Sequence, residues 1–98
     1  MAQVMVVYWR DIPAQVIAGK GRRATKVVLP ERFEQAIDRA AMKSGASETD
    51  AYLADWRKSD PFEVEGDDAT ATSALGTKLD AEYDQDKLKA LIDNGGFA

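Results

Sequence analysis

The residues best able to bind an anion gather in the first quarter of the chain. They are five cations: Arg10, Lys20, Arg22, Arg23 and Lys26. With Asp11 as the one acid among them, residues 1–26 carry a net charge of +4, so the remainder of this −4 chain carries −8. Guanidinium groups beside the flexible Gly19-Lys20-Gly21 backbone could bind phosphate or carboxylate groups in a bidentate manner. The alternatives are a solvated hairpin tip and internal pairing with the acidic remainder.

A second candidate is the segment Tyr8-Trp9-Arg10-Asp11, which sets an ionisable pair beside two aromatic rings. A carboxylate held there could act as a general base. In the structural alternative, both charges are paired with other groups and Trp9 belongs to the core.

Four acidic residues form two close pairs, Asp67 with Asp68 and Asp84 with Asp86. The run Asp84-Gln85-Asp86 could begin a calcium loop, but the turn glycine and the distal bidentate glutamate of such loops are missing. Helix capping explains both pairs better. Because the chain has no histidine and no cysteine, the commonest metal ligands and most nucleophile–base pairs are excluded. We expect no metal, no cofactor, and a non-catalytic protein rather than an enzyme.

The segment that must position these residues is apolar at every position from Val4 to Trp9, and its β-branched and aromatic side chains favour a strand. Because both alternating sets are apolar, this strand should lie at the centre of a sheet and be covered on both faces. The row formed by Met5, Val7 and Trp9 then needs cover from the C-terminal helices or from another molecule. In the second case the row is a protein-binding or homodimer face.

Two further strands, residues 14–18 and 22–29, should form a hairpin around Gly19-Lys20-Gly21, where glycine can adopt positive φ. Pro30 then begins a helix whose apolar stripe runs from Phe33 to Ala41 and which stops at Gly45.

A short helix should stack Tyr52 on Trp56 at i, i+4 spacing and end at Ser59-Asp60-Pro61. Residues 62–65 alternate between apolar and charged side chains, as expected for an outer strand with one solvent-exposed face. A third helix should start at Gly66-Asp67-Asp68, and its apolar residues recur every four positions from Ala71 to Tyr83, with Gly76 as a weak spot. A fourth begins at an Asp84 cap and ends at Asn94-Gly95-Gly96.

The predicted order is therefore β-β-β-α-α-β-α-α in one α+β domain over residues 1–98. Short connections favour a small, mostly antiparallel sheet of about four strands, ordered 3-2-1-4, with helices packed on it. A chain of this length buries roughly two-thirds of its unfolded surface, enough for a core without disulfides.

Net negative charge disfavours nucleic acid as a partner, because nucleic-acid binding relies on positive charge that displaces counterions. The N-terminus has no basic and apolar leader, and no apolar run approaches membrane-spanning length. We therefore expect a cytoplasmic protein without membrane contact.

The segments YWRDIPAQV (residues 8–16) and LPERFEQAID (residues 29–38) resemble the small virulence factor domain family. The likeness covers residues 3–57 well and the acidic C-terminal third loosely. Members are short stand-alone bacterial proteins, and a similar domain stands at the C-terminus of a larger conserved virulence factor. The motifs have no known catalytic assignment, so the resemblance supplies no site residues. For the stand-alone branch it implies association with folate- and corrinoid-dependent one-carbon enzymes, such as methylenetetrahydrofolate reductase and methyltransferases.

Together these observations favour a non-catalytic accessory protein that engages a larger protein partner, or a second copy, through its sheet face or basic hairpin. The alternative is a small anionic-ligand-binding protein or minor enzyme, in which Arg10, Arg22 and Arg23 bind a folate, a nucleotide or a phosphate. Ligand binding of that kind would add measurable thermal stability.

Overall fold

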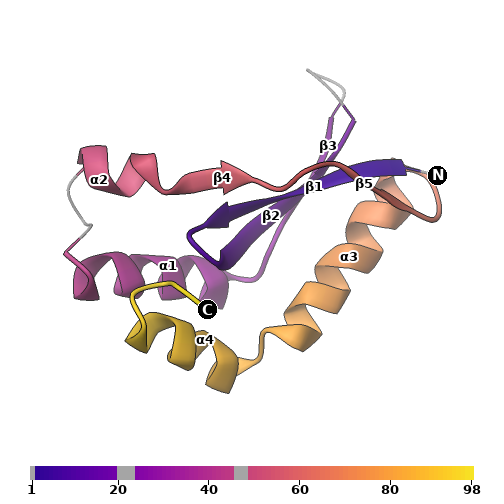
Figure 1. The fold of residues 1–98 in the computed structure, drawn as a ribbon. Coiled ribbons are helices and arrows are strands. Elements are labelled where there is room, and N and C mark those ends of the chain that lie inside the picture. Colours follow the sequence, from indigo (N-terminus) through magenta and orange to yellow (C-terminus); the bar gives the residue numbers. More distant parts are fainter. Residues whose placement is uncertain (1, 20–23, 46–48) are drawn as a thin grey trace.

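The computed structural model describes residues 2–19, 24–45 and 49–98. Within these ranges the chain forms five strands and four helices (Figure 1). The strands are β1 (Ala2–Trp9), β2 (Ile12–Ala18), β3 (Thr25–Val28), β4 (Trp56–Lys58) and β5 (Phe62–Val64). The helices are α1 (Glu31–Lys43), α2 (Thr49–Ala54), α3 (Asp68–Glu82) and α4 (Gln85–Asp93). The α+β class is confirmed, with β4 as an additional strand.

Strand β1 is the centre of the sheet, as its apolar sequence predicts. It pairs antiparallel with β2, which pairs with β3, and its other edge is shared by β4 and β5, giving the order β3-β2-β1-β4. Ser59 bridges the break in that shared edge. The Val6 N–H donates to Ser59 Oγ across 2.9 Å, and the Ser59 N–H donates to the Val6 carbonyl across 2.9 Å. The predicted 3-2-1-4 order is confirmed, since the predicted fourth strand, residues 62–65, is present as β5 on the free edge of β1, which it shares with β4.

The prediction for Trp56 is wrong in its secondary structure. Helix α2 ends at Ala54, and Trp56 lies on β4 opposite Trp9. The two aromatic rings still meet, because the Tyr52 and Trp56 centroids are 5.8 Å apart at an interplanar angle of 81°. Residues 56–58 pair with the open edge of β1 instead of continuing the helix, and the two rings nevertheless stay in contact.

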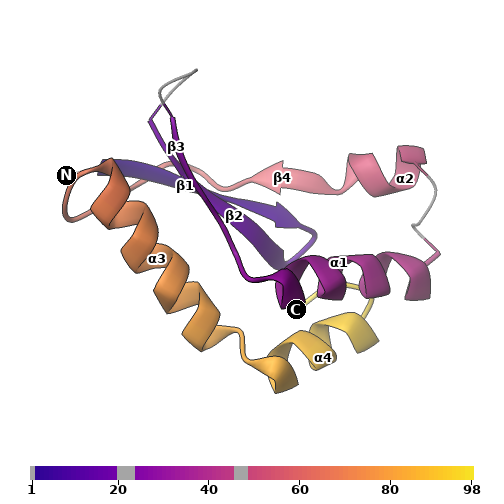
Figure 2. The ribbon, with the colours of Figure 1, turned by 180° about the vertical axis from the view of Figure 1, so that it is seen from behind.

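The three longer helices lie on one side of the sheet, as the front and back views both show (Figures 1 and 2). Helix α3 crosses β1, β2 and β3, and α1 packs against α4 and the end of β2. A Cβ built on Gly76 would lie 3.3 Å from Val27 Cγ1, so this glycine allows α3 to approach β3 closely. Gly76, predicted as a weak spot of the helix, is a packing site.

The main core lies between this side of the sheet and the helices. The predicted stripe of α1 is buried in full, from Phe33 to Ala41. The other large side chains of the core are those of Val4, Val6, Trp9, Ile12, Val16, Leu79, Leu88 and Leu91. No helix within the described ranges combines the length and apolar content needed to cross a bilayer.

The predicted starts of α3 and α4 and the predicted end of α4 are confirmed by their caps. Asp67 accepts a hydrogen bond from the Thr70 N–H at 2.8 Å, and Asp84 accepts one from the Lys87 N–H at 2.9 Å. At the end of α4, the Gly96 N–H donates to the Leu91 carbonyl across 2.7 Å, while Gly95 has a φ of 69°. This is the Schellman arrangement, in which a left-handed glycine lets the chain turn back over the helix end.

Trp9 is fully enclosed where that turned-back segment meets the sheet. It has 0% exposure, and its Nε1 donates to the Tyr52 carbonyl across 2.8 Å. The Trp9 and Tyr52 rings stack at 5.8 Å, and a Cβ on Gly96 would come within 3.0 Å of Trp9 Cζ3. Helix α2 and the C-terminal turn therefore cover the end of the strand.

Candidate functional site

Arg10 is bound to the protein itself. It occupies the β1–β2 turn with a φ of 54°, in the left-handed region that a non-glycine residue seldom adopts. Its Nε lies 3.0 Å from Asp55 Oδ2, and its Nη1 donates to the Gly95 carbonyl across 2.6 Å. The guanidinium carbon is 4.7 Å from the Trp9 ring centre and 4.6 Å from that of Phe97. These contacts join three distant segments of the chain.

The described chain separates Arg10 from the rest of the predicted basic cluster. Lys20, Arg22 and Arg23 lie outside the described residues. Lys26 is exposed on β3 opposite Ile17, near the end of β2 that lies furthest from Arg10. The anion-binding role of this cluster therefore stays a prediction for Lys26 and the three residues of the hairpin tip.

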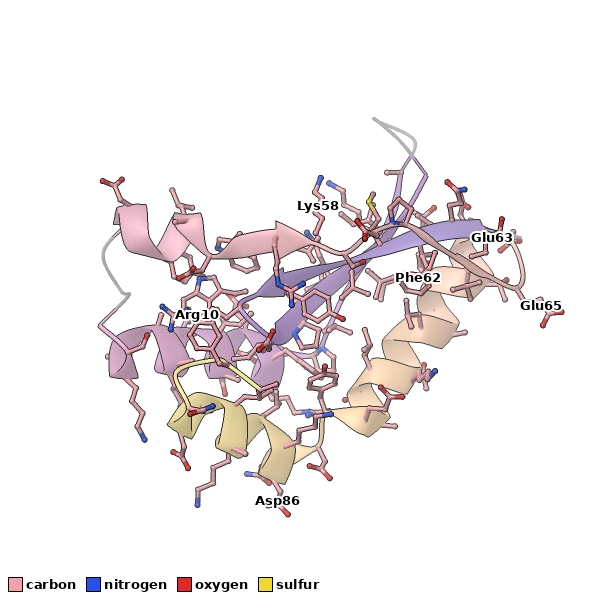
Figure 3. All side chains as sticks on the ribbon, in the orientation of Figure 1. Arg10, Lys58, Phe62, Glu63, Glu65 and Asp86 are labelled. Carbon is pink, nitrogen blue, oxygen red and sulfur yellow. The ribbon has the colours of Figure 1, made fainter. Side chains whose placement is uncertain are left out.

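The side of the sheet away from the helices carries a second row of side chains. Strand register places Met5 opposite Ile17, and Val7 opposite both Gln15 and Lys58, so these side chains share one face. We call it the second sheet face. Its members are Gln3, Met5, Val7, Gln15, Ile17, Lys26, Val28, Lys58 and Glu63. Figure 3 shows Lys58 projecting away from the helices.

The centre of the second sheet face is apolar and its flanks are charged. Val7 and Ile17 are 8% and 7% exposed, whereas Val28 is 75% exposed. Lys26 and Lys58 stand on opposite flanks, and neither forms an ion pair within the part of the chain that is described. Of the predicted interface row, Trp9 is inside the core, while Met5 and Val7 lie on this face.

A depression of about 260 Å³ continues the second sheet face at its Trp56 end. Gln15 and Val28 form one wall, and Ile37, Tyr52 and Trp56 form the other. Burial raises the pKa of the Tyr52 phenol, and the negative charges of Asp38 and Glu34 add to the effect. The phenol is therefore neutral at physiological pH.

A second depression, which we call the phenol pocket, opens on the helical side of the sheet with a volume of about 330 Å³. Strand β1 supplies Tyr8, the end of α3 supplies Tyr83, β4 supplies Arg57 and α4 supplies Lys87. Its complete lining is Tyr8, Asp11, Arg57, Ser59, Tyr83, Lys87, Leu91 and Ala98.

Each cation of the phenol pocket rests on a tyrosine ring. The Arg57 guanidinium carbon is 4.5 Å from the Tyr8 ring centre, and Lys87 Nζ is 4.3 Å from that of Tyr83. Arg57 Nε donates to the Arg10 carbonyl across 3.0 Å, and Arg57 Nη2 donates to Asp11 across 3.1 Å. Cation–π contact and these hydrogen bonds together hold the guanidinium in place.

The other groups of the phenol pocket are also fixed or neutral. Asp11 accepts a hydrogen bond from the Ala98 N–H at 2.7 Å in addition to the one from Arg57. Burial raises the pKa of Tyr8, against the opposing charge of Arg57, and burial also raises the pKa of Tyr83, with the charge of Tyr8 next in effect. Both phenols are therefore protonated donors at neutral pH. Neither hydroxyl has a hydrogen-bond partner among the described residues.

A larger depression of about 940 Å³ lies between α1 and α4, but its charges are mixed and partly satisfied. Arg32 forms an ion pair with Asp80 and donates from Nη1 to the Tyr83 carbonyl across 2.6 Å. Arg32 therefore acts chiefly as a brace that fixes the backbone of Tyr83 beside the phenol pocket.

Sequence reasoning missed Arg57, Tyr83 and Lys87 as site residues, because the fold brings them to Tyr8 from separate segments. One local signal was present, since Tyr83 and Lys87 are four residues apart at the junction of two helices. Aromatic and cationic side chains at that spacing can meet even across a short break in the helix.

The comparisons with known proteins concern the chain as a whole. The family described as "Virulence factor" matches residues 7–92, from the last part of β1 almost to the end of α4. No curated protein and no solved structure matches the chain. The family match includes the acidic C-terminal third as well as the strand and helix motifs of the first half. This chain belongs to the virulence factor family.

Proposed function

We propose that this protein is a non-catalytic accessory protein that docks its second sheet face on an acidic surface of a larger protein. The observation that carries the proposal is a sheet face without cover from the three longer helices, on which Val28 is 75% exposed and Met5 is partly exposed between Lys26 and Lys58. Figure 3 shows Lys58 on one flank of this face. Interfaces combine such an apolar centre with a charged rim, and the rim charges direct partner choice.

The charges favour a different protein over a second copy as the occupant. Lys26 and Lys58 outnumber Glu63 on the face, so two copies placed face to face would join two surfaces of net positive charge. An acidic partner would complement the lysines, while Met5 and Val28 would supply apolar contact. The exposed Val28 side chain is the best placed of these to enter a partner's pocket, at 75% exposure.

For the identity of the partner, the proposal relies on the family resemblance. For the stand-alone branch of the family, the resemblance implies association with folate- and corrinoid-dependent one-carbon enzymes. We therefore propose a methylenetetrahydrofolate reductase or a corrinoid methyltransferase as the larger protein. The docking surface and the identity of the partner are separate parts of the proposal, and the experiment below distinguishes them.

The test is affinity isolation of the tagged protein at native expression level, with mass-spectrometric identification of bound proteins. The Lys26→Glu/Lys58→Glu variant should lose a stoichiometric acidic partner that the wild type retains. Arg39→Glu/Lys89→Glu is the matched control, because it reverses two exposed charges on the helical side of the molecule. Thermal melts of both variants would show that the fold is intact.

No stoichiometric partner, or a partner that the Lys26→Glu/Lys58→Glu variant retains in full, would contradict docking through this face. An acidic partner unrelated to one-carbon chemistry would leave the docking surface standing and refute the proposed identity.

A further inference from the structure

We propose that the phenol pocket binds the carboxylate group of a small, partly apolar molecule. The pocket is on the helical side of the sheet and shares no residue with the second sheet face. Binding of a small molecule here is therefore independent of the docking function proposed above, and each can fail without the other.

Hydrogen-bond donors dominate the polar lining of the pocket. The Tyr8 and Tyr83 hydroxyls are without partners among the described residues, and Lys87 Nζ has only the Tyr83 ring below it. Arg57 uses its Nε hydrogen for the Arg10 carbonyl and one Nη2 hydrogen for Asp11, which leaves both hydrogens of Nη1 and one of Nη2. A carboxylate accepts hydrogen bonds only, at about four lone-pair sites, and so matches a set of donors.

The charge of the lining selects a monoanion. Among the side chains of the lining, Arg57 and Lys87 contribute two positive charges and Asp11 contributes one negative charge, so the side chains carry a net charge of +1. A carboxylate balances that charge. A doubly charged phosphate would add excess negative charge close to Asp11, and like charges at that distance repel.

The remaining walls are apolar. Tyr8 and Tyr83 line the pocket together with Leu91, and the volume of about 330 Å³ is at the small end of the range for ligand sites. Neither ring is expected to reorganise on binding, since Arg57 and Lys87 already rest on them. A carboxylate attached to a flat or short apolar body fits these walls better than a bare anion does.

The test uses benzoate as a carboxylate with an apolar body, and benzamide as its neutral isostere. Titrations of the whole protein are followed by the NMR shifts of the amides of Arg57, Tyr83, Lys87 and Leu91. We expect saturable benzoate binding with a millimolar Kd and little or no effect of benzamide. Acetate should bind more weakly than benzoate, and inorganic phosphate more weakly still.

Three variants separate the pocket from general electrostatics. Lys87→Gln and Tyr8→Phe/Tyr83→Phe should each weaken benzoate about tenfold, the loss expected from removing hydrogen bonds to a charged group. Lys89→Gln, which removes an exposed charge from the same helix outside the pocket, should leave the affinity unchanged. Absence of saturation, equal binding of benzamide, tighter binding of phosphate, or an unchanged Kd for Lys87→Gln would each overturn the proposal.

Discussion

Arg10 donates a hydrogen bond from Nη1 to the carbonyl oxygen of Gly95 across 2.6 Å, although the two residues are 85 positions apart in the chain. The β1–β2 turn is thereby joined to the end of α4. Since Arg10 is also paired with Asp55, a single side chain connects the sheet, the α2–β4 junction and the C-terminal turn.

We expect Arg10→Ala to lower the free energy of unfolding by about 2 kcal/mol, the usual worth of hydrogen bonds to a charged group that is mostly buried. Arg10→Lys should recover little, because an ammonium group cannot reproduce the planar contact between the two rings and two acceptors. Urea denaturation measures both, with Arg39→Ala on the exposed side of α1 as control. A lysine variant as stable as wild type would show that charge alone matters at this position.

The two tryptophans should report different environments. Trp9 is fully buried and Trp56 is half-buried. In Trp56→Phe the remaining tryptophan is Trp9, whose fluorescence should be emitted at short wavelength. In Trp9→Phe the remaining tryptophan is Trp56, whose emission should be red-shifted. Trp9→Phe also removes the donor to the Tyr52 carbonyl, which should cost about 1–3 kcal/mol of unfolding free energy. Equal emission maxima for the two variants would contradict the burial of Trp9.

Gly76 tests how closely α3 approaches β3. Gly76→Ala should stay within about 1 kcal/mol of wild type, because the gain in helix propensity offsets the contact with Val27. Gly76→Val should destabilise by about 1–3 kcal/mol, because its additional methyl groups overpack the contact. Thermal or urea unfolding distinguishes the two, and a valine variant of wild-type stability would mean that the helix can move away freely.

Alkaline pH should weaken the fold through the buried phenols. Burial raises the pKa values of Tyr8 and Tyr83 above the unfolded value of 10.0, so their stabilising contribution is complete below that pH. It is lost as the pH rises through the folded-state pKa values, because the unfolded chain releases these protons first. Tyr8→Phe/Tyr83→Phe should therefore show a smaller fall in urea midpoint between neutral pH and about pH 11.

Much of the fold could be predicted because its signals are local. The run from Val4 to Trp9 is apolar in both alternating sets of side chains, and a central strand is the element that can bury them. Aspartates at helix starts and glycines at helix ends form their hydrogen bonds within one turn of the helix, so they can be recognised locally. Trp56 shows where such signals stop. The i, i+4 spacing from Tyr52 fits a helix, but the backbone of Trp56 forms hydrogen bonds with the open edge of β1, which is distant in sequence, and therefore adopts a strand conformation.

The candidate sites were less predictable for the same physical reason. Arg10 stands close to the basic hairpin in sequence, yet its partners Asp55, Gly95 and Phe97 come from the second half of the chain. The phenol pocket depends on Tyr8 meeting Tyr83 across the molecule, and no composition or spacing rule near either residue encodes that meeting.

The interrupted outer edge of the sheet also protects the protein from other copies of itself. A continuous exposed strand invites edge-to-edge association between chains, the first step toward fibrils. Here β4 and β5 are each three residues long, Pro61 has no N–H to offer, and Ser59 already bonds to Val6 through both its amide and its hydroxyl. The broken edge thus gives this short chain a built-in resistance to amyloid-like growth along that side.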